Sequence, residues 1–303
     1  MAVSHMVAAR EIAREFDPAR PVLIAGPTAS GKSALALALA ELQGGVIVNA
    51  DAIQVYENWR ILTARPSAED ENRAPHALYG HVAGDTPYSV GDWLRAVADL
   101  RQSGARLIVT GGTGLYFTAL TDGLAEIPAT PPEIRAEGAA LLAKIGLEAM
   151  VADLDAETAA RIDRNNPARV MRAWEVLRST GQGLAAWQAQ TPPPLLPLNH
   201  AQTALFEAPK DWLTPRIEAR FDKMIATGAL EEAQANLPSW SPTLPSSKAI
   251  GAAELIAVVR GEMPLPAASA RATILTRQFA KRQRTWFKAR MSGWRRVHPG
   301  ALA

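Results

Sequence analysis

The stretch "LIAGPTASGKS", residues 23–33, decides the fold class of this chain. It matches Gly-x4-Gly-Lys-Ser, with an apolar run at 21–25 before it and an alanine- and leucine-rich run at 33–45 after it. These runs predict a buried strand and a helix, which is the context of a phosphate-binding P-loop. The other interpretation is a strand–turn–helix joint that binds nothing. The residues predicted to hold phosphate are Gly26, Pro27, Thr28, Ala29, Ser30, Gly31, Lys32 and Ser33, and the Ser33 hydroxyl is also placed to bind Mg²⁺.

Strands and helices alternate after this loop. Residues 45–51 read as a second buried strand, 88–104 as a helix, and 105–117 as a third strand followed by another glycine turn. Such alternation predicts an α/β fold, a P-loop NTPase-like parallel sheet flanked by helices that binds its ligands at the carboxyl ends of the strands.

Two proline-rich stretches, 127–135 and 191–199, bracket a segment that reads as helix only. Its clearest helix is 166–181, with Asn166 as N-cap, Pro167 at the first helical position and Gly181 as the stop. We therefore expect an all-helical insertion domain at 123–199, within an α/β core made of 20–122 and 200–303.

Composition limits the function classes. The 303 residues are 48% apolar and contain no cysteine, no apolar run long enough to span a membrane and no signal-peptide core at the N-terminus. These features predict a cytoplasmic protein without a membrane segment or disulfides. The five histidines show no metal-ligand spacing.

The C-terminal segment from residue 271 onward is strongly basic. It holds nine of the 32 Lys and Arg residues and none of the 30 Asp and Glu residues. In a helix, Leu275, Phe279 and Trp286 fall within about 40° of one another and predict a docking face. A solvated surface is the other interpretation of such a charge run, but the lack of acids favours contact with nucleic-acid phosphates. The opposite, basic face is made of Arg277, Lys281, Arg284 and Lys288.

Asp51 is the only acidic residue at the end of a predicted strand. An NTPase of this fold usually places an acid after a second strand to organise Mg²⁺ and water, but here that strand ends in Thr110 and two glycines. A carboxylate beside a held diphosphate, without a water-activating partner, suits a general base acting on an incoming nucleophile. A structural cap on the next turn is the other interpretation.

The chain resembles the tRNA dimethylallyltransferases, also called tRNA isopentenyltransferases, over about residues 20–290. Several of the shared blocks are long. In chain order they are "GPTASGKS", "NADAIQVY", "TARPS", "VTGGTGLYF", "LDAETAARIDRNNPARVMRAWEV", "RIEARFDKM", "AIGAAE" and "TRQFAKRQRTWF". The resemblance implies transfer of a dimethylallyl group from dimethylallyl diphosphate to the exocyclic amine of adenosine 37, in the anticodon stem-loop of tRNA.

The resemblance also implies residue roles. Asp51 would take the proton from the amine, Gln54 would fix the flipped adenine, Thr113 would line the channel between the substrates, and Arg216 or Arg220 would clamp the leaving diphosphate. The catalytic set is thus Asp51, Thr28, Arg216 and Arg220, with Mg²⁺ as cofactor and a monomer as the working form. The residues implied to contact tRNA are Asp51, Ala52, Ile53, Gln54, Thr113, Ala168, Arg169, Val170, Met171, Arg172, Arg277, Lys281, Arg282 and Arg284. The segments 168–172 and 276–283 are implied to contact it as a whole.

Five positions depart from the family's usual residues. Serine, glycine, lysine, histidine and tyrosine are common where this chain has Ala52, Leu62, Arg65, Ala77 and Ala252. The departures leave Asp51, Gln54 and the phosphate loop intact.

Three alternatives stay open at this point. A P-loop phosphotransferase or NTPase matches the glycine loop equally well. A transferase acting on free adenine nucleotides would need neither the insertion nor the acid-free tail. A non-catalytic RNA-binding protein would keep the fold without the chemistry.

Overall fold

The protein is described by a computed structural model that covers the backbone of residues 2–302 and the side chains of residues 7–300. It divides into two compact units, Met1–Thr121 with Leu196–Ala303, and Asp122–Leu195. The domain limits predicted from the proline-rich stretches, 123 and 199, lie close to these.

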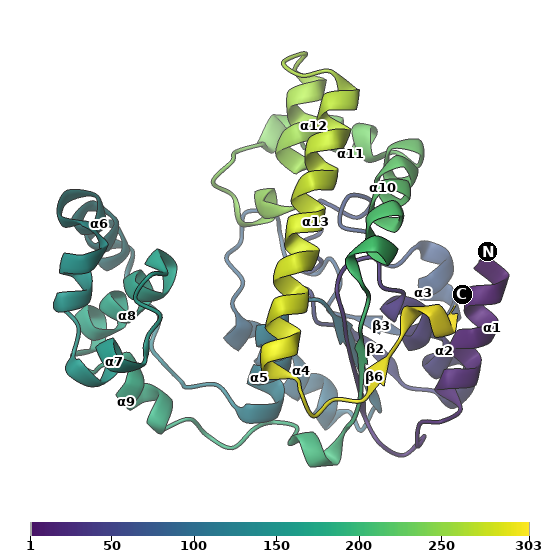
Figure 1. The fold of residues 1–303 in the computed structure, drawn as a ribbon, viewed down its shortest axis with the longest axis horizontal. Coiled ribbons are helices and arrows are strands. Elements are labelled where there is room, and N and C mark those ends of the chain that lie inside the picture. Colours follow the sequence, from purple (N-terminus) through teal and green to yellow (C-terminus); the bar gives the residue numbers. More distant parts are fainter. Residues whose placement is uncertain (1, 303) are drawn as a thin grey trace. The chain divides into compact units, whose positions relative to one another are not determined.

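The larger unit is built on a six-stranded sheet in the order β3-β2-β4-β1-β5-β6, and every neighbouring pair is parallel (Figure 1). The predicted α/β fold class is therefore confirmed. The two edge strands, β3 and β6, were not predicted, because two residues are too few to show a periodicity. The strands are β1 (Val22–Ala25), β2 (Val46–Asn49), β3 (His76–Ala77), β4 (Leu107–Gly111), β5 (Gln202–Phe206) and β6 (Arg296–Val297).

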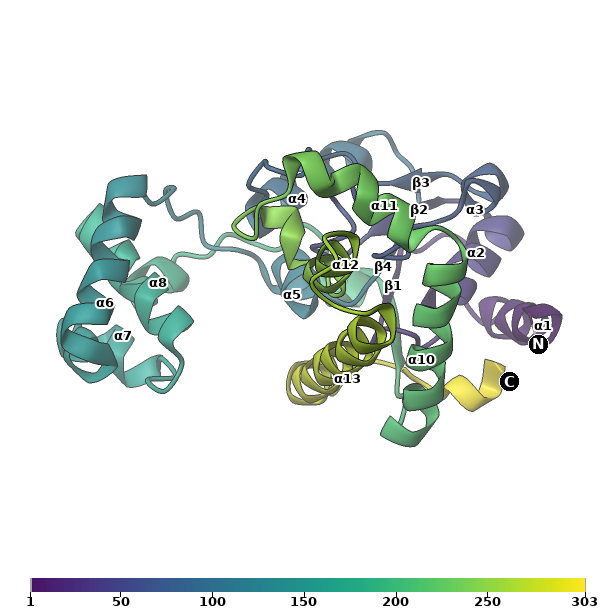
Figure 2. The ribbon, with the colours of Figure 1, turned by 90° about the horizontal axis from the view of Figure 1, so that it is seen from above.

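Helices flank this sheet. The N-terminal helix α1 packs on α2, while α10 and α13 run beside one another and α12 packs on both α11 and α13 (Figures 1 and 2). The helices of this unit are α1 (Ala2–Ala13), α2 (Lys32–Gln43), α3 (Ala68–Arg73), α4 (Val90–Gln102), α5 (Gly114–Asp122), α10 (Lys210–Ala226), α11 (Ala229–Asn236), α12 (Ala252–Val259) and α13 (Leu265–Arg290). In the described part of the chain, no helix has both the length and the apolar character needed to cross a membrane.

The strand register brings three loops to one edge of the sheet. Thr110 in β4 pairs with Ile24 in β1 on one side and with Asn49 in β2 on the other, so the three central strands end at the same level. The phosphate loop, the turn that carries Asp51 and the glycine turn after β4 consequently meet there.

The docking face predicted for α13 is wrong, because it is rotated about the helix axis from the face that is buried. Leu275, Phe279 and Trp286 are only half-buried. The face that packs against the protein is offset from them and consists largely of small residues, which allow neighbouring helices to approach closely. Its buried members are Ala268, Ala272, Thr273, Ala280, Gln283 and Phe287. A pattern of large apolar residues therefore pointed to the margin of the contact rather than to its centre.

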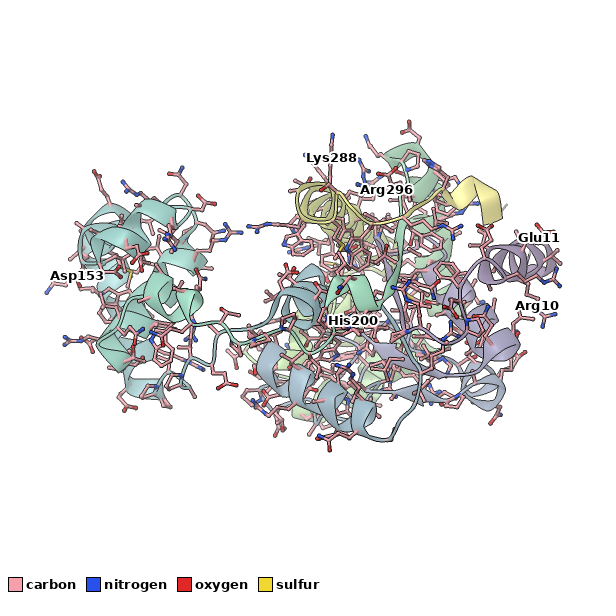
Figure 3. The ribbon with its side chains drawn as sticks, turned by 90° about the horizontal axis from the view of Figure 1, so that it is seen from below. Arg10, Glu11, Asp153, His200, Lys288 and Arg296 are labelled. Carbon is pink, nitrogen blue, oxygen red and sulfur yellow. The ribbon has the colours of Figure 1, made fainter. Side chains whose placement is uncertain are left out.

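The smaller unit consists of helices only: α6 (Pro132–Ala152), α7 (Ala156–Arg161), α8 (Pro167–Thr180) and α9 (Leu184–Ala189). The predicted ends of α8 are confirmed, since the Asn166 side chain accepts a hydrogen bond from the Arg169 N–H and Gly181 ends the helix in a left-handed conformation. Trp174 is buried in the core of this unit and donates its indole N–H to Asp153, which is labelled in Figure 3.

Loss of the α8 cap should loosen its first turn. We expect Asn166→Ala to cost about 1 kcal/mol locally, because the Arg169 N–H loses its acceptor. Hydrogen exchange of the amides in the first turn of α8 should then accelerate about 5-fold, whereas Asn165→Ala, at the neighbouring exposed position, should change it little. Equal exchange in the two variants would contradict the capping role.

Candidate active site

The phosphate loop has the backbone that a phosphate cradle needs. Ala29 and Gly31 lie in the left-handed region at φ 61° and 93°, which turns the loop around a central space. Gly26 cannot carry a side chain, because a Cβ there would lie 2.8 Å from the Phe206 Cβ and 2.9 Å from the Ser30 Oγ. Close packing against β5 therefore holds the start of the loop in place.

Two cations and one carboxylate interact at this edge of the sheet. Burial first, and the positive charge of Arg220 second, lower the pKa of the Lys32 ammonium to about 8, while the Asp51 carboxylate acts in the opposite direction. Burial also lowers the pKa of Arg220, and Asp51 again opposes the shift. Burial and the charge of Asp51 together raise the pKa of the Tyr79 hydroxyl. Asp51 is thus in electrostatic contact with both cations of the cradle.

The two candidate arginines of α10 have different surroundings. Arg220 interacts electrostatically with Lys32 and Asp51: its charge lowers the pKa of Lys32, and Asp51 opposes the lowering of its own pKa by burial. Arg216 lies one turn away with its guanidinium 3.6 Å from the centre of the Trp212 ring, and it donates to the Trp212 carbonyl. The structure therefore brings Arg220 into the charge cluster and leaves Arg216 stacked on its own helix.

Asn49, at the end of β2, shapes the turn that carries Asp51. Its fully buried side chain accepts the Asp51 N–H (2.8 Å) and donates to the carbonyls of Asp51 and Leu78 (both 3.0 Å). The Trp93 indole N–H donates to the Asn49 carbonyl at 2.6 Å. The Asp51 carboxylate itself accepts the Ile53 N–H, which limits its rotation. Sequence reasoning missed Asn49, because an amide next to a candidate base carries no distinctive spacing.

Thr113 connects the glycine turn after β4 to the same segment. Its hydroxyl accepts the Ala52 N–H (2.9 Å), and its own N–H donates to the Ala50 carbonyl (3.0 Å). Thr113 thus contacts the backbone on both sides of Asp51. The hydroxyl predicted to line a channel is already bonded to the backbone beside Asp51, so Thr113 orients that turn.

The loop at residues 60–64 binds the Gln54 side chain and is itself anchored to α11. The Gln54 side chain donates to the carbonyls of Thr63 and Ala64, and within the described residues its amide oxygen accepts no hydrogen bond. The Glu232 carboxylate in turn accepts the N–H groups of residues 60, 61 and 62 at 2.6–2.9 Å. Glu232 had no signal in the sequence, since it lies about 170 residues from its partners.

Two of the departures from the family's usual residues meet in one core. Leu62 and Ala252 both belong to the buried cluster under α11 and α12, and Leu62 lies against Gly251. Arg65 donates to the carbonyls of Tyr56 and Glu57, which ties the same loop back to the segment after Asp51. These departures alter the support of the loop and leave Asp51 and Gln54 in place.

The basic face of α13 is only partly neutralised. Arg277 forms an ion pair with Glu218 (3.5 Å), whereas Lys281, Arg282 and Arg284 form none with any residue that the structure describes. Lys288 projects from α13 into open space (Figure 3). The tail residues Arg271, Arg295 and Arg296 pair with glutamates. The unpaired charges therefore concentrate on the middle and end of α13.

One of the tRNA contacts predicted in the helical unit, Val170, is wrong. The Val170 side chain is fully buried in that unit's core, so it stabilises α8 and cannot present its side chain to RNA. Ala168 and Arg169 are exposed and Met171 is half-buried. Arg172 donates to the Thr130 hydroxyl at 2.6 Å.

A cavity of about 270 Å³ opens beside the phosphate loop. Its lining includes Ser33, Gln54, Tyr79 and Thr110, and the Thr110 hydroxyl is buried without a hydrogen-bond partner. In the described residues no three Asp, Glu, His or Cys side chains gather as a metal site. A site that offers only oxygen atoms as ligands fits Mg²⁺, because this ion usually keeps several of its waters and is bound largely through substrate phosphates.

Comparisons with known proteins identify the class first. A model of the IPP transferase family matches residues 54–290, which is more than half of the chain, and an isopentenyl transferase model matches residues 20–75. The tRNA dimethylallyltransferase of Cereibacter sphaeroides strain KD131 is 63% identical over 92% of this chain and 88% of its own. That of Dinoroseobacter shibae is 63% identical over 93% and 96%, and that of Roseobacter denitrificans is 57% identical over 93% and 100%.

Solved structures agree with this class. The full-length tRNA isopentenylpyrophosphate transferase of Bacillus halodurans has a TM-score of 0.62 at 30% identity, covering 92% of this chain and 90% of its own. A eukaryotic dimethylallyltransferase acting on tRNA shares the fold, with a TM-score of 0.77 at 22% identity over 92% and 73% of the two chains. The chain belongs to the tRNA dimethylallyltransferase family.

The lowered pKa of Lys32 predicts a pH-dependent affinity for anions. In the ligand-free protein Lys32 loses its proton above about pH 8, whereas a bound diphosphate keeps it protonated. Affinity for inorganic pyrophosphate should therefore fall as pH rises above 8, by up to about tenfold per pH unit.

Calorimetry of wild type and Lys32→Arg measures this effect. The arginine stays charged over the same pH range, so any pH dependence in Lys32→Arg comes from the titration of pyrophosphate itself. That dependence can then be subtracted from the wild-type profile. Identical pH profiles for the two proteins would contradict the assignment of Lys32 to the cradle.

Proposed function

We propose how the chain performs the reaction of its family, the transfer of a dimethylallyl group from dimethylallyl diphosphate to the exocyclic amine of adenosine 37 in tRNA. The observation that carries the proposal is the electrostatic interaction of Asp51 with Lys32 and Arg220 at the edge of the sheet. It places a base next to two cations, and the reaction needs both.

The phosphate loop binds the leaving group. The N–H groups of residues 29 and 31–33 in the loop surround the diphosphate, and Lys32 and Arg220 neutralise the charge that accumulates on it as the allylic C–O bond breaks. Arg220 is the clamp, since Arg216 is engaged with Trp212. Because the two cations are already in place, little reorganisation is needed during the reaction.

Asp51 acts on the nucleophile. The amine nitrogen of adenine attacks the allylic carbon, a C–N bond forms, and the proton released from that nitrogen passes to the Asp51 carboxylate. The free amide oxygen of Gln54 accepts a hydrogen bond from the flipped base and keeps its amine directed at the carboxylate. Asn49 and Thr113 hold the turn in the required orientation.

Mg²⁺ supports the binding of the diphosphate. The Ser33 hydroxyl would hold it, with the buried Thr110 hydroxyl lining the same cavity. The ion supplies positive charge to the diphosphate oxygens when it is bound. The residues of the chain still determine where the leaving group lies.

The unpaired cations of α13 and the exposed residues of α8 bind the anticodon stem-loop. Backbone phosphates account for this affinity, and a loop nucleotide leaves its stack at low cost. We further propose that the protein acts as a monomer and, because its substrate is tRNA, in the cytoplasm.

Mass spectrometry of tRNA nucleosides tests the function as a whole. Incubation of the protein with unmodified tRNA, Mg²⁺ and dimethylallyl diphosphate should yield isopentenyladenosine at position 37. ATP turnover without prenyl transfer would support a phosphotransferase, and transfer to AMP at the rate seen with tRNA would support a transferase of free nucleotides.

Replacing the base separates chemistry from binding. We expect Asp51→Ala to lower the single-turnover rate by at least about 100-fold, because the amine loses its proton acceptor, with tRNA affinity within about 3-fold of wild type. Unchanged transfer would rule out Asp51 as the base. Loss of tRNA binding alone would assign it to recognition.

Neutralising the basic face should act on tRNA only. Lys281→Gln with Arg284→Gln removes two phosphate contacts, so we expect weaker tRNA binding and a salt slope flatter by about 2. Arg295→Gln with Arg296→Gln, whose charges are already paired with glutamates, is the matched control. An unchanged slope in the first variant would contradict the basic-face assignment.

The two arginines of α10 form a matched pair. Arg220→Met should weaken the binding of inorganic pyrophosphate by about 10-fold or more, because a half-buried cation of the cradle is lost. Arg216→Met should change it less than about 3-fold. The reverse order in calorimetry would show that Arg216 leaves Trp212 to act as the clamp.

A further inference from the structure

Gln283 lies on α13 in a segment expected to contact RNA, but its side chain is buried, with 5% of its surface exposed. Its amide oxygen accepts the Thr28 N–H of the phosphate loop at 2.9 Å. Its amide nitrogen donates to the Gly112 carbonyl of the turn after β4, also at 2.9 Å. One side chain therefore joins the two loops that flank the Asp51 turn, and both of its ends are satisfied.

The geometry around this bridge is tight. A methyl group on Gly112 would lie 2.1 Å from the Gln283 amide nitrogen and 3.5 Å from the Asp51 Oδ2. The absence of a side chain on Gly112 thus leaves the space that the Gln283 amide occupies. On the same helix, Trp286 packs over Gly114, where any side chain would collide with its ring.

A second contact links α13 to the phosphate loop. Ala280, one turn before Gln283, belongs to a buried cluster with Leu213 and Ile217 of α10, and Ala29 of the phosphate loop packs against that cluster. The helix that carries the unpaired cations therefore touches the loop through an apolar contact and through Gln283. Thr28 cannot offer its N–H to a phosphate while this bond is made, so its predicted role in holding diphosphate is left to its hydroxyl.

We propose that Gln283 is a positioning residue for the transfer reaction. It keeps the phosphate loop and the glycine turn at a fixed separation, so that the leaving group and the Asp51 carboxylate stay aligned, and it makes the tRNA-binding helix part of the cradle. Misplacement of reacting groups by about 1 Å can cost about 100-fold in rate. The inference rests on the proposed function, since it assumes that Asp51 and the loop act on the two substrates.

Two variants and a matched control test it. Gln283→Met keeps the length and volume of the side chain and removes both hydrogen bonds. Gln283→Glu keeps the acceptor for the Thr28 N–H but, when ionised, cannot donate to Gly112. Gln278→Met makes the same change at an exposed position of the same helix. Each protein is compared for thermal unfolding, tRNA affinity, pyrophosphate affinity and single-turnover rate at saturating substrates.

We expect Gln283→Met to transfer about 10- to 100-fold more slowly than Gln278→Met at saturation, with tRNA affinity within about 2-fold. For Gln283→Glu, the rate relative to wild type should rise as pH falls, because a protonated carboxyl regains the donor to Gly112.

Saturated rates for Gln283→Met within about 2-fold of the control would overturn the proposal. So would a loss confined to thermal stability and tRNA affinity, which a purely structural contact produces. If Gln283→Met does not fold, Gln283→Glu decides the question by the presence or absence of recovery at low pH. Failure of wild type to prenylate tRNA would refute the proposed function instead, and pyrophosphate affinity would still report on the bridge.

Discussion

The site depends on keeping two cations, Lys32 and Arg220, close together at the edge of the sheet before any substrate is present. Their mutual repulsion and their burial both disfavour the charged form of Lys32, and Asp51 compensates only in part. An anion with more than one negative charge relieves this imbalance, so the ligand-free protein already favours a diphosphate. The same arrangement stabilises a diphosphate that gains charge as it leaves, which is the property catalysis needs.

The parallel sheet makes this arrangement possible, and a few polar side chains adjust it. Three central strands end at one level and bring three loops to the same edge of the sheet. Asn49 and Thr113 then fix the Asp51 turn, while Glu232 holds the loop that supports Gln54. These contacts are made to backbone groups, so the orientation of the turn does not depend on a single residue next to the substrate.

The parts that local patterns could predict are those whose chemistry needs a fixed spacing. The phosphate loop, Asp51 after a buried strand and the capped helix α8 are all local, and each was found. Gln283, Glu232 and the choice between Arg216 and Arg220 depend on contacts between distant segments, which no local spacing encodes. The phase of α13 was predicted wrongly because half of the residues on its buried face are alanines, and alanine gives a weak hydrophobic signal.

The central claim is that the loop grips a leaving group attached to carbon while Asp51 faces the nitrogen that replaces it. A crystal structure with the anticodon stem-loop and an unreactive thio-analogue of dimethylallyl diphosphate tests it most directly. The diphosphate should lie in the loop against Lys32 and Arg220, with the amine of the flipped adenine between the allylic carbon and the Asp51 carboxylate. A diphosphate bound outside the loop, or an Asp51 carboxylate turned away from the adenine, would contradict the account.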